Sequence, residues 1–472
     1  MKKTNIVATL GPSSSSLEMI EEMIVKGVDV FQINMSHTKL DVCMELIGKI
    51  RKVEKKLNKI IGIMLGTEGP SIRLDKLKEE EVSLSLEKEI RFYNYHVVCN
   101  NTQLSTNYDN LTNLVELHDE IILADGKCVL EVIDINDDNF LCEVKKEGII
   151  KSNQTVHIKN GSSKLPFISK TDYDNIMFAI NNNVDFLALS YVRDEQDILE
   201  VIDLLIENSN DHTNIIAKIE NEKAYDNLDE ILKVVDGIMV ARGDLGIEIP
   251  LEKLPFYQKK ILEKANEYQK LGLVATDLLK SMVLDENPSR AEVADIYNAV
   301  FDKCDALVLG EETTIGNYPV DCIEVINKVI LEAESDFSYK ENLEDTFKIV
   351  NQDITSTIAY SVVNSDLILN ANGILVNTIS GYTARKISYF KPKSVIFTMS
   401  PKINTLRSLT LNYGVFPCLV NNFHDTDTII KESIQNYLEK FNGKKGDTII
   451  ITGGMPIDSA STDIMKIEKI ND

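Results

Sequence analysis

The chain has 472 residues, of which 50 are basic and 74 acidic, so its formal net charge at pH 7 is −24. At roughly 100–200 residues per domain, this length predicts three or four domains and excludes a small scaffold that depends on disulfide bonds. The negative charge disfavours phosphate backbones and anionic membrane surfaces, so we expect neither nucleic acid nor a membrane as a partner.

Over the first 340 residues, short apolar runs rich in β-branched residues alternate with longer amphipathic stretches. Eight runs predict parallel strands, at residues 5–10, 29–34, 60–65, 185–190, 214–219, 237–241, 271–276 and 305–310. Helical patterns separate most of them, at 16–27, 39–56, 195–209 and 252–270. Eight strand–helix units in a row most simply close into a (β/α)8 TIM barrel, with an open, doubly wound sheet as the alternative.

The alternation of strands and helices is interrupted after the third strand and again after the eighth strand–helix unit, beyond which it resumes. After the third strand, short alternating strands predict an inserted small β-barrel domain, and after the eighth unit an acidic connector at 334–347 leads to a C-terminal α/β domain. The inserted strands are expected at 90–100, 128–135, 139–148 and 155–158, and the C-terminal ones at 373–378, 394–399, 416–420 and 447–452. The expected domains are therefore 1–73 with 161–340, 74–160, and 341–472.

No apolar run approaches the roughly 20 residues that span a bilayer, and the first residues enter a strand pattern with no signal-peptide core. The seven cysteines form no C-x-x-C pair, which is typical of reduced thiols in a reducing compartment. We therefore expect a cytoplasmic protein.

Polar residues follow most of the eight runs, where the reacting groups of a barrel enzyme lie. These strand-end residues are Asn34, Ser36, His37, Thr67, Arg73, Lys218, Glu220, Arg242, Asp244, Thr276, Glu311 and Glu312. His37 has no nucleophile beside it in the sequence, so an orienting or hydrogen-bonded histidine is a better interpretation than a catalytic base.

Glu220 and Asp244 follow adjacent strands, close enough to share one Mg²⁺ ion, which typically takes one or two protein carboxylates. Lys218 lies two residues before Glu220 and therefore points to the same side of its strand. Beside a metal, an ammonium group can stabilise charge on a phosphoryl group or an enolate. The alternative is a surface ion pair or a carboxylate that caps a helix.

With these residues assembled, the chain resembles the pyruvate kinase family over essentially its full length. The resemblance depends on the motifs "NIVATLGPSS", "QINMSH", "GTEGPSIR", "LADGK", "KIENE", "DGIMVARGDLGIEIP", "NPSRAEVADIYNAV" and "EETTIGNYP", in the family's order and approximate spacing. The family's fold is a barrel with a small β domain after the third strand and a C-terminal α/β domain.

The resemblance implies phosphoryl transfer from phosphoenolpyruvate to ADP, giving pyruvate and ATP. It implies catalytic roles for Lys218 and Thr276, a divalent metal (Mg²⁺ or Mn²⁺) on Glu220 and Asp244, and a K⁺ site. The implied substrate-binding residues are Gln32, Lys218, Gly243, Asp244 and Thr276, with the backbone N–H groups around Gly243 and Asp244 on the substrate carboxylate. Nucleotide contacts are implied for Asn34, His37 and Arg73, and K⁺ ligands for Asn34, Ser36 and Thr67.

Several positions depart from the family's pattern, mostly on the nucleotide and phosphoryl side. Gln32 stands where the family has arginine, Gly66 where it has aspartate, and Glu68 where it has lysine. In the inserted domain, Asn153 and Gln154 replace an expected lysine pair. Each lost charge-assisted contact to phosphate is worth about 1.5–3 kcal/mol, so activity is expected to be reduced and K⁺ dependence is left open.

Two other functions remain compatible with the sequence. One is a catalytically weak paralogue that binds phosphoenolpyruvate or an effector as a sensor or regulatory subunit, and the other is a barrel lyase or hydrolase that acts on the enolate of a small oxo acid. In the C-terminal domain, Ser380, Gly381 and Thr383 resemble a loop that binds an effector phosphate, although a strand-to-helix turn capped by Thr383 explains them equally well. A homotetramer is implied by the resemblance alone.

Overall fold

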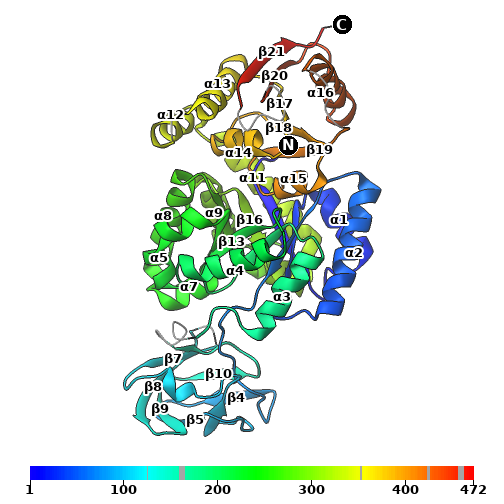
Figure 1. Ribbon diagram of the computed structural model, residues 1–472. Coiled ribbons are helices and arrows are strands. Elements are labelled where there is room, and N and C mark those ends of the chain that lie inside the picture. The colour runs from blue at the N-terminus through cyan, green and yellow to red at the C-terminus, as the bar shows by residue number, and fades with distance from the viewer. Residues whose placement is uncertain (125, 159–164, 351–352, 422–425, 455–461, 472) are drawn as a thin grey trace.

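The structure, a computed structural model, describes residues 1–471 apart from 125, 159–164, 351–352, 422–425 and 455–461. The barrel lies in the middle, with the inserted β part at one end and the C-terminal α/β part at the other (Figure 1). Asp125 of the motif "LADGK" and the expected domain boundary between residues 160 and 161 lie outside the described residues. Among the helices that are described, none has the length and apolar character needed to cross a membrane.

Eight parallel strands close into a barrel in the order β1–β16–β15–β14–β13–β12–β3–β2. Most of their residues are buried, because helices cover the outside of the barrel and side chains fill the inside. The strands are β1 Asn5–Thr9, β2 Val30–Asn34, β3 Gly62–Gly66, β12 Phe186–Leu189, β13 Asn214–Ile219, β14 Gly237–Ala241, β15 Leu271–Ala275 and β16 Ala306–Leu309. All eight predicted strands are confirmed, and the doubly wound alternative is wrong.

The amphipathic segments between the strands form the outer ring of helices (Figure 1). In α1 (Leu17–Lys26), the Ser16 hydroxyl accepts the N–H of Met19, and Gly27 ends the helix with a φ of 119°, which glycine adopts without strain. The other barrel helices are α2 Leu40–Leu57, α3 Lys170–Asn181, α4 Glu195–Glu207, α5 Glu222–Asp226, α6 Leu228–Val234, α7 Arg242–Glu248, α8 Leu254–Glu267, α9 Arg290–Phe301, α10 Glu311–Thr314 and α11 Pro319–Asp336.

The inserted part follows β3, as predicted. It consists of a six-stranded sheet in the order β11–β7–β8–β9–β5–β6 and a two-stranded sheet of β10 and β4, and both sheets contribute to one core. The stacked rings of Phe92 and Phe140, with centroids 5.0 Å apart, lie in that core. The strands are β4 Glu81–Leu84, β5 Glu89–Tyr93, β6 Gln103–Ser105, β7 Glu120–Leu123, β8 Cys128–Ile135, β9 Asn139–Lys146, β10 Gly148–Lys151 and β11 His157–Ile158.

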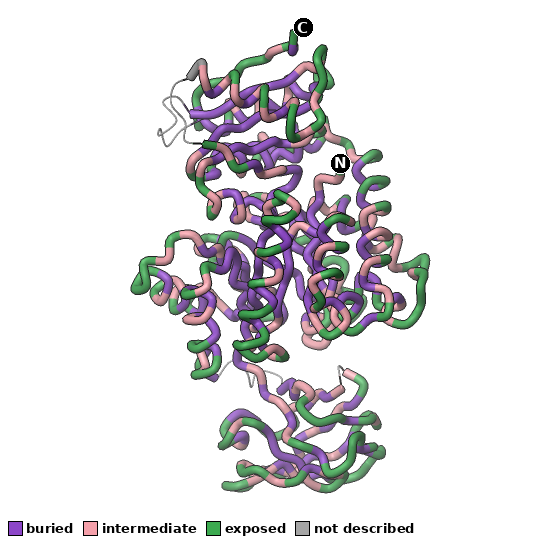
Figure 2. The backbone as a smooth tube through the Cα atoms, turned by 90° about the vertical axis from the view of Figure 1, so that its right-hand side faces the viewer, coloured by how far each residue is buried: buried purple, intermediate pink, exposed green. Residues whose placement is uncertain are grey.

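The C-terminal part is a five-stranded sheet in the order β19–β18–β17–β20–β21, with helices packed against it. The strands β17, β18 and β20 in the middle of this sheet are buried like the barrel strands, and Figure 2 shows long buried segments in both parts. Its strands are β17 Gly373–Asn377, β18 Ile396–Ser400, β19 Val415–Leu419, β20 Thr448–Gly453 and β21 Ile464–Lys469. Its helices are α12 Tyr339–Ile349, α13 Ile354–Leu369, α14 Tyr382–Tyr389, α15 Ile403–Ser408 and α16 Thr426–Lys440.

Two expectations for this part need correction. The acidic connector expected at 334–347 is wrong, since its first residues complete α11 and most of the rest forms α12. The helix α12 packs on α13, where Leu343 joins the hydrophobic cluster, and its Asn342 side chain donates to the carbonyl oxygen of Phe390. The strand β21 was not predicted, and it is an antiparallel edge strand whose side chains are mostly exposed.

The C-terminal part closes the end of the barrel opposite to the inserted part. Leu411, in the loop between α15 and β19, is fully buried in the cluster that fills the barrel, together with Val30, Met64 and Phe186. The neighbouring Thr410 approaches Gly62 so closely that a Cβ atom on Gly62 would lie 2.3 Å from the Thr410 hydroxyl oxygen. A glycine is therefore required at the start of β3 for this loop to dock.

We expect Leu411→Ala to lower the free energy of unfolding by about 2–3 kcal/mol, because it removes buried methyl groups and leaves a cavity at the barrel axis. Urea-induced unfolding of the full chain measures the change. Leu419→Ala, at an exposed position on β19, is the matched control and should have little effect. Equal losses of unfolding free energy in the two variants would contradict the role of Leu411 in filling the end of the barrel.

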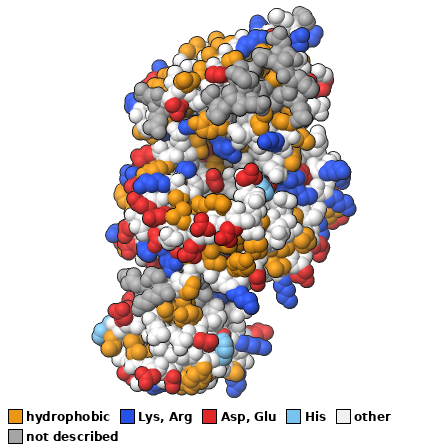
Figure 3. Space-filling model, in the orientation of Figure 1, with side chains coloured by type: hydrophobic (Ala, Val, Ile, Leu, Met, Phe, Trp, Pro, Cys, Tyr) orange, Lys and Arg blue, Asp and Glu red, His pale blue; other side chains and the backbone are white. Residues whose placement is uncertain are grey.

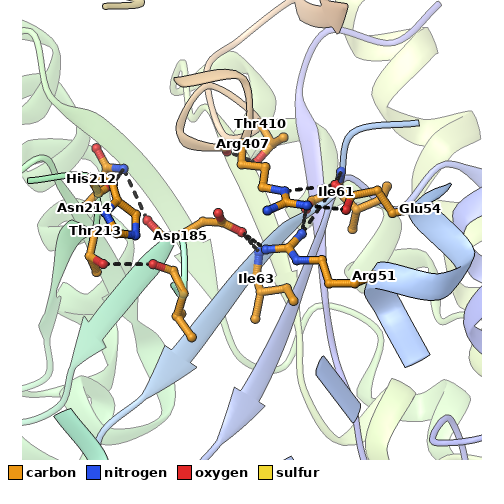
Figure 4. A network of polar contacts seen from close by, with 11 residues as sticks. Arg51, Glu54, Ile61, Ile63, Asp185, His212, Thr213, Asn214, Arg407 and Thr410 are labelled. Atoms are coloured by element: carbon orange, nitrogen blue, oxygen red, sulfur yellow. Dashed lines mark hydrogen bonds and ion pairs between the residues drawn. The ribbon is translucent and has the colours of Figure 1, made fainter. Parts of the chain in front are cut away.

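An ion-pair network fastens the C-terminal part to the barrel (Figure 4). Arg407 of α15 binds Glu54 of α2 through two contacts of 2.6 and 3.1 Å. Arg51 lies 2.6 Å from the carboxylate of Asp185, and this same oxygen accepts the N–H of Ile63 at 2.8 Å. The network thus reaches from the C-terminal part to the first residues of β3 and β12.

The surface has the charge that the composition predicts. Acidic side chains are spread over the visible face of the barrel in Figure 3, in keeping with the net charge of −24. All seven cysteines are free and buried, so their thiols are shielded from solvent.

Candidate active site

Three chemically reactive side chains meet at the end of the barrel that faces the inserted part. Lys218 and Glu220 are at the end of β13, and Asp244 is in the first turn of α7, which directly follows the neighbouring strand β14. These are the carboxyl ends of the strands, where TIM-barrel active sites lie. This grouping was predicted from the strand ends alone.

Lys218 and Glu220 form a buried ion pair. The Lys218 Nζ lies 2.5 Å from the Glu220 Oε1, and Glu220 is only 1% exposed. Burial lowers the pKa of the Lys218 ammonium group, but the charges of Glu220 and Asp244 outweigh this effect and raise it above the usual value. Lys218 therefore remains a cation, and its Nζ also donates to the Ser190 hydroxyl at 3.0 Å.

Tyr191, the second residue after β12, contacts both carboxylates. Its backbone N–H donates to the Glu220 Oε2 at 2.6 Å, and its hydroxyl donates to the Asp244 Oδ1 at 3.0 Å. Burial, and then the charges of Asp244 and Glu220, raise the pKa of the Tyr191 hydroxyl well above its usual value, so it stays protonated. Its backbone has a φ of 55°, an uncommon left-handed conformation for a bulky aromatic residue.

The residues at this site fit a divalent cation with oxygen ligands. The Glu220 Oε1 is a buried carboxylate oxygen that faces the Lys218 ammonium group, and the described residues offer it no further partner. Two carboxylates on adjacent elements match the one or two protein ligands that Mg²⁺ usually takes, its other positions being left to water and substrate oxygens. Among the described residues no cluster of three or more His, Cys, Asp or Glu side chains is suited to a metal.

Thr276 follows β15 and lies beside the start of α7. Its hydroxyl accepts the N–H of Gly243 at 2.7 Å, so that amide, expected to hold the substrate carboxylate, is already engaged. Thr276 has a φ of 71°, and Arg242 stabilises this strained backbone by donating to the Thr276 carbonyl oxygen from Nε and Nη2 at 3.2 and 2.6 Å. Asp295 in turn pairs with Arg242 at 2.6 Å.

Beyond β12 in the barrel order, the ends of β3 and β2 bear the uncharged side chains of Thr67, Gln32 and Asn34. Gln32 is 9% exposed, its Oε1 has no hydrogen-bond partner among the residues that the structure describes, and its Nε2 would lie 3.9 Å from a Cβ atom built on Gly66. The Thr67 hydroxyl accepts the N–H of Ser190 at 3.0 Å, and the Asn34 Oδ1 accepts the N–H of Ser36 at 3.1 Å. The oxygens expected to bind K⁺ on Asn34 and Thr67 therefore already accept protein hydrogen bonds.

Arg73 lies at the junction between the barrel and the inserted part. Its Nη1 donates to the carbonyl oxygen of Asn153 at 3.1 Å. Loss of hydration and then the Arg73 charge lower the pKa of His37. Burial raises the pKa of Glu68, and the Arg73 charge opposes this increase. The charge of Arg73 thus acts on both His37 and Glu68.

Two further residues singled out in the sequence have structural roles. Glu312 is buried, and its carboxylate accepts the N–H groups of Leu279 and Gly310 at 3.0 and 2.8 Å. Gln154, at a position where cations were expected, accepts the N–H of Lys151 at 2.9 Å and thereby stabilises a turn.

In the C-terminal part, the loop after β17 borders a cavity of about 870 Å³ between this part and the barrel. Ser380, Arg385 and Lys402 line the cavity. Gly381 has a φ of 82° and precedes α14 without any side-chain cap, so the alternative of a cap by Thr383 is wrong. The Thr383 hydroxyl is buried against that of Thr462, at 2.6 Å.

Ser190 and Tyr191 were not predicted as site residues. Both follow the fourth apolar run and could have been found by the rule that identified the other strand ends, but neither is a residue type with an obvious metal or phosphate role. Their importance comes from contacts with three other strand ends, which no local pattern reveals.

Comparison with known proteins adds independent information. The family model described as "Pyruvate kinase, barrel domain" matches residues 1–323, and the one described as "Pyruvate kinase, alpha/beta domain" matches residues 356–468. A protein of Bacillus licheniformis named pyruvate kinase is 37% identical over 474 residues, and one of Staphylococcus epidermidis with the same name is 38% identical over 475 residues. Both alignments cover 100% of this chain and 81% of the relative.

Proposed function

Because this chain belongs to the pyruvate kinase family, we propose that it transfers the phosphoryl group of phosphoenolpyruvate to ADP, giving pyruvate and ATP in glycolysis. The observation that carries the proposal is the meeting of Lys218, Glu220 and Asp244 at one barrel mouth. Neither the fold nor the similar proteins favour a regulatory paralogue or a barrel lyase or hydrolase.

The reaction breaks the bond between phosphorus and the enol oxygen, forms a bond from phosphorus to a terminal oxygen of ADP, and adds a proton to the enolate carbon. Charge spreads over several oxygens in the transition state, so catalysis is mainly positioning and cationic stabilisation. Mg²⁺ or Mn²⁺, held by Glu220 and Asp244, would neutralise oxygens of the phosphoryl group and the substrate.

The protein's own groups supply the remaining steps. The Lys218 ammonium group stabilises the charge that develops on the phosphoryl and enolate oxygens. The backbone N–H groups around Gly243 and Asp244 bind the substrate carboxylate, and for this the Gly243 N–H exchanges its bond to the Thr276 hydroxyl. Once released from that bond, the Thr276 hydroxyl lies in the path that delivers the proton to the enolate carbon.

We assign the nucleotide and the monovalent cation to the part of the mouth at the ends of β2 and β3. Asn34, His37 and Arg73 face the nucleotide, and Gln32 contacts the phosphoryl group through its amide. Asn34, Ser36 and Thr67 are the proposed K⁺ ligands. Since Gly66 supplies no carboxylate to this set, we expect K⁺ to have a weak effect on the rate.

Several broader features remain predictions of family membership. We propose a barrel domain of residues 1–73 and 161–340, an inserted lid of 74–160 and a C-terminal α/β domain of 341–472. A phosphorylated effector is proposed at the loop of Ser380, Gly381 and Thr383. We also propose a homotetramer and a cytoplasmic location.

A coupled assay tests the function directly, by following pyruvate formed from phosphoenolpyruvate and ADP with Mg²⁺, with and without K⁺. We expect turnover that disappears when a chelator removes Mg²⁺ and that changes little with K⁺. Absence of pyruvate formation with both Mg²⁺ and Mn²⁺, at all K⁺ concentrations, would contradict the proposal.

We expect Gln32→Arg together with Gly66→Asp to raise kcat/KM for phosphoenolpyruvate about tenfold, since a charge-assisted contact to phosphate is worth about 1.5–3 kcal/mol. The arginine alone buries an unpaired cation, whereas a carboxylate on Gly66, where a Cβ atom has room, neutralises it. Gln32→Arg alone should therefore gain less than the double variant. Steady-state kinetics of both variants measure the gain.

The control is Gln32→Arg with Gly66→Asn, which adds a side chain of similar size without the charge. A double variant with Asp that is no more active than this control would refute the charge argument. Activation by K⁺ should also increase in the variant with Asp, because the K⁺ site regains an anionic ligand.

A further inference from the structure

The turn after β12 contacts three other strand ends of the site, those of β3, β13 and β14. Ser190 bonds to both the hydroxyl and the carbonyl oxygen of Thr67 after β3, and it accepts a bond from Lys218 on β13. Tyr191 continues the same path to Glu220 and Asp244. None of the roles assigned to the other site residues explains why a tyrosine occupies this position.

The two carboxylates are anchored to very different extents. Glu220 is buried, lies against Lys218 and accepts the N–H of Tyr191. Its carboxylate is therefore held in one orientation by burial and by two polar contacts. Asp244 is only partly buried and lies in a seven-residue helix next to the exposed Gly243. Within the described part of the chain, the hydroxyl of Tyr191 is the one hydrogen-bond donor to its carboxylate.

The backbone of Tyr191 is shaped for this double contact. A φ of 55° is uncommon for a residue with a Cβ atom and costs free energy of the order of 1–3 kcal/mol. This conformation directs the N–H towards Glu220 while the ring extends to Asp244 on the next element, so one residue spans both ligands. A strained backbone conformation of this kind persists where the surrounding contacts hold it in place. Here the hydrogen bonds of Ser190 and Tyr191 do so.

We propose that Tyr191 is a positioning residue of the metal site, which holds Glu220 through its amide and orients Asp244 through its hydroxyl before the cation binds. This inference depends on the proposed function, because it assumes that the two carboxylates bind the metal. Partners that orient a ligand typically contribute 10–100-fold to metal affinity, by fixing the ligand's direction in advance.

The test is Tyr191→Phe, which removes the hydroxyl and keeps the ring and the backbone amide. Binding of Mn²⁺ to the full-length protein without substrates is measured by electron paramagnetic resonance of the free ion. We expect the dissociation constant to rise about tenfold. In the assay, the Mn²⁺ concentration at half-maximal rate should rise by a similar factor, while kcat at saturating Mn²⁺ stays within about twofold of the original.

The matched control is Tyr297→Phe, whose hydroxyl donates to Asp336 at 2.8 Å on the outside of the barrel. It removes the same kind of bond away from the site and should leave Mn²⁺ binding unchanged. Thermal unfolding of both variants is recorded, and similar midpoints with different Mn²⁺ affinities would support positioning rather than general stability.

A double-mutant cycle identifies the route of the effect. If Tyr191 acts through Asp244, Tyr191→Phe should have no further effect on Mn²⁺ binding in an Asp244→Ala background. An unchanged dissociation constant in Tyr191→Phe, or full additivity with Asp244→Ala, would overturn the inference. Failure of the proposed function is a different result, in which Glu220→Gln and Asp244→Ala themselves leave Mn²⁺ binding unchanged.

Discussion

Replacing Lys218 by methionine is expected to lower kcat about a thousandfold, the largest effect on activity among the proposed substitutions. Methionine keeps the apolar stem of the side chain but removes the cation that faces the reacting oxygens. Single groups that stabilise developing charge contribute about 10²–10³-fold in acyl transfer, and cationic groups in phosphoryl transfer contribute 10³-fold or more. The coupled pyruvate assay at saturating phosphoenolpyruvate and ADP measures the loss.

Metal binding separates this role from a structural one. Without Lys218, Glu220 loses a competing cation, so the affinity for Mn²⁺ should be kept or increased while kcat falls. The control is Lys260→Met, at an exposed lysine that pairs with Glu263, and it should leave kcat unchanged. A Lys218→Met variant with an unchanged kcat would eliminate the catalytic role of this side chain.

Lys391→Met is expected to lower the free energy of unfolding by about 3–5 kcal/mol, the largest effect on stability. Lys391 follows α14 in the C-terminal part, and Asp305 immediately precedes β16 of the barrel. Their side chains are 2% and 3% exposed, they form an ion pair, and the Lys391 Nζ lies 4.8 Å above the ring of Tyr413. Loss of the lysine leaves a buried carboxylate without its counter-charge, which is costly in a region of low dielectric constant.

Urea titration of the full chain measures this change, with Lys348→Met as the control, because the pair of Lys348 and Asp345 is exposed and should contribute little to stability. Adding Asp305→Asn to Lys391→Met should restore part of the lost stability, since the uncompensated charge is then removed. A single variant that loses under about 1 kcal/mol, or a double variant less stable than the single one, would contradict this account.

The barrel strands were predictable because each is a short, mostly apolar run that is largely buried, a pattern that depends on local sequence alone. The strand β21 was not predictable, since it is an exposed edge strand and lacks the pattern of apolar residues that marks a buried strand. The acidic stretch that forms α12 has a polar outer face and only a few buried residues, so its composition is that of a connector.

The same distinction applies to the candidate site. Lys218, Glu220, Asp244 and Thr276 were found because parallel strands place their ends together, so position along the chain determines position in the barrel. The contribution of Tyr191 depends on a left-handed backbone and on contacts with residues 29 and 53 positions away. Such contacts are fixed by tertiary packing and leave no periodic signal.

Because Leu411 completes the hydrophobic filling of the barrel, the catalytic domain is not a module that can be separated from the C-terminal part. A chain that ended after α11 would leave the axis of the barrel open to water at the end away from the active site and would expose the start of β3, where Gly62 receives Thr410. Exchange of the C-terminal part between related proteins would therefore succeed only if the incoming segment carried, at the position of Leu411, an apolar side chain that fits the interior of the recipient's barrel.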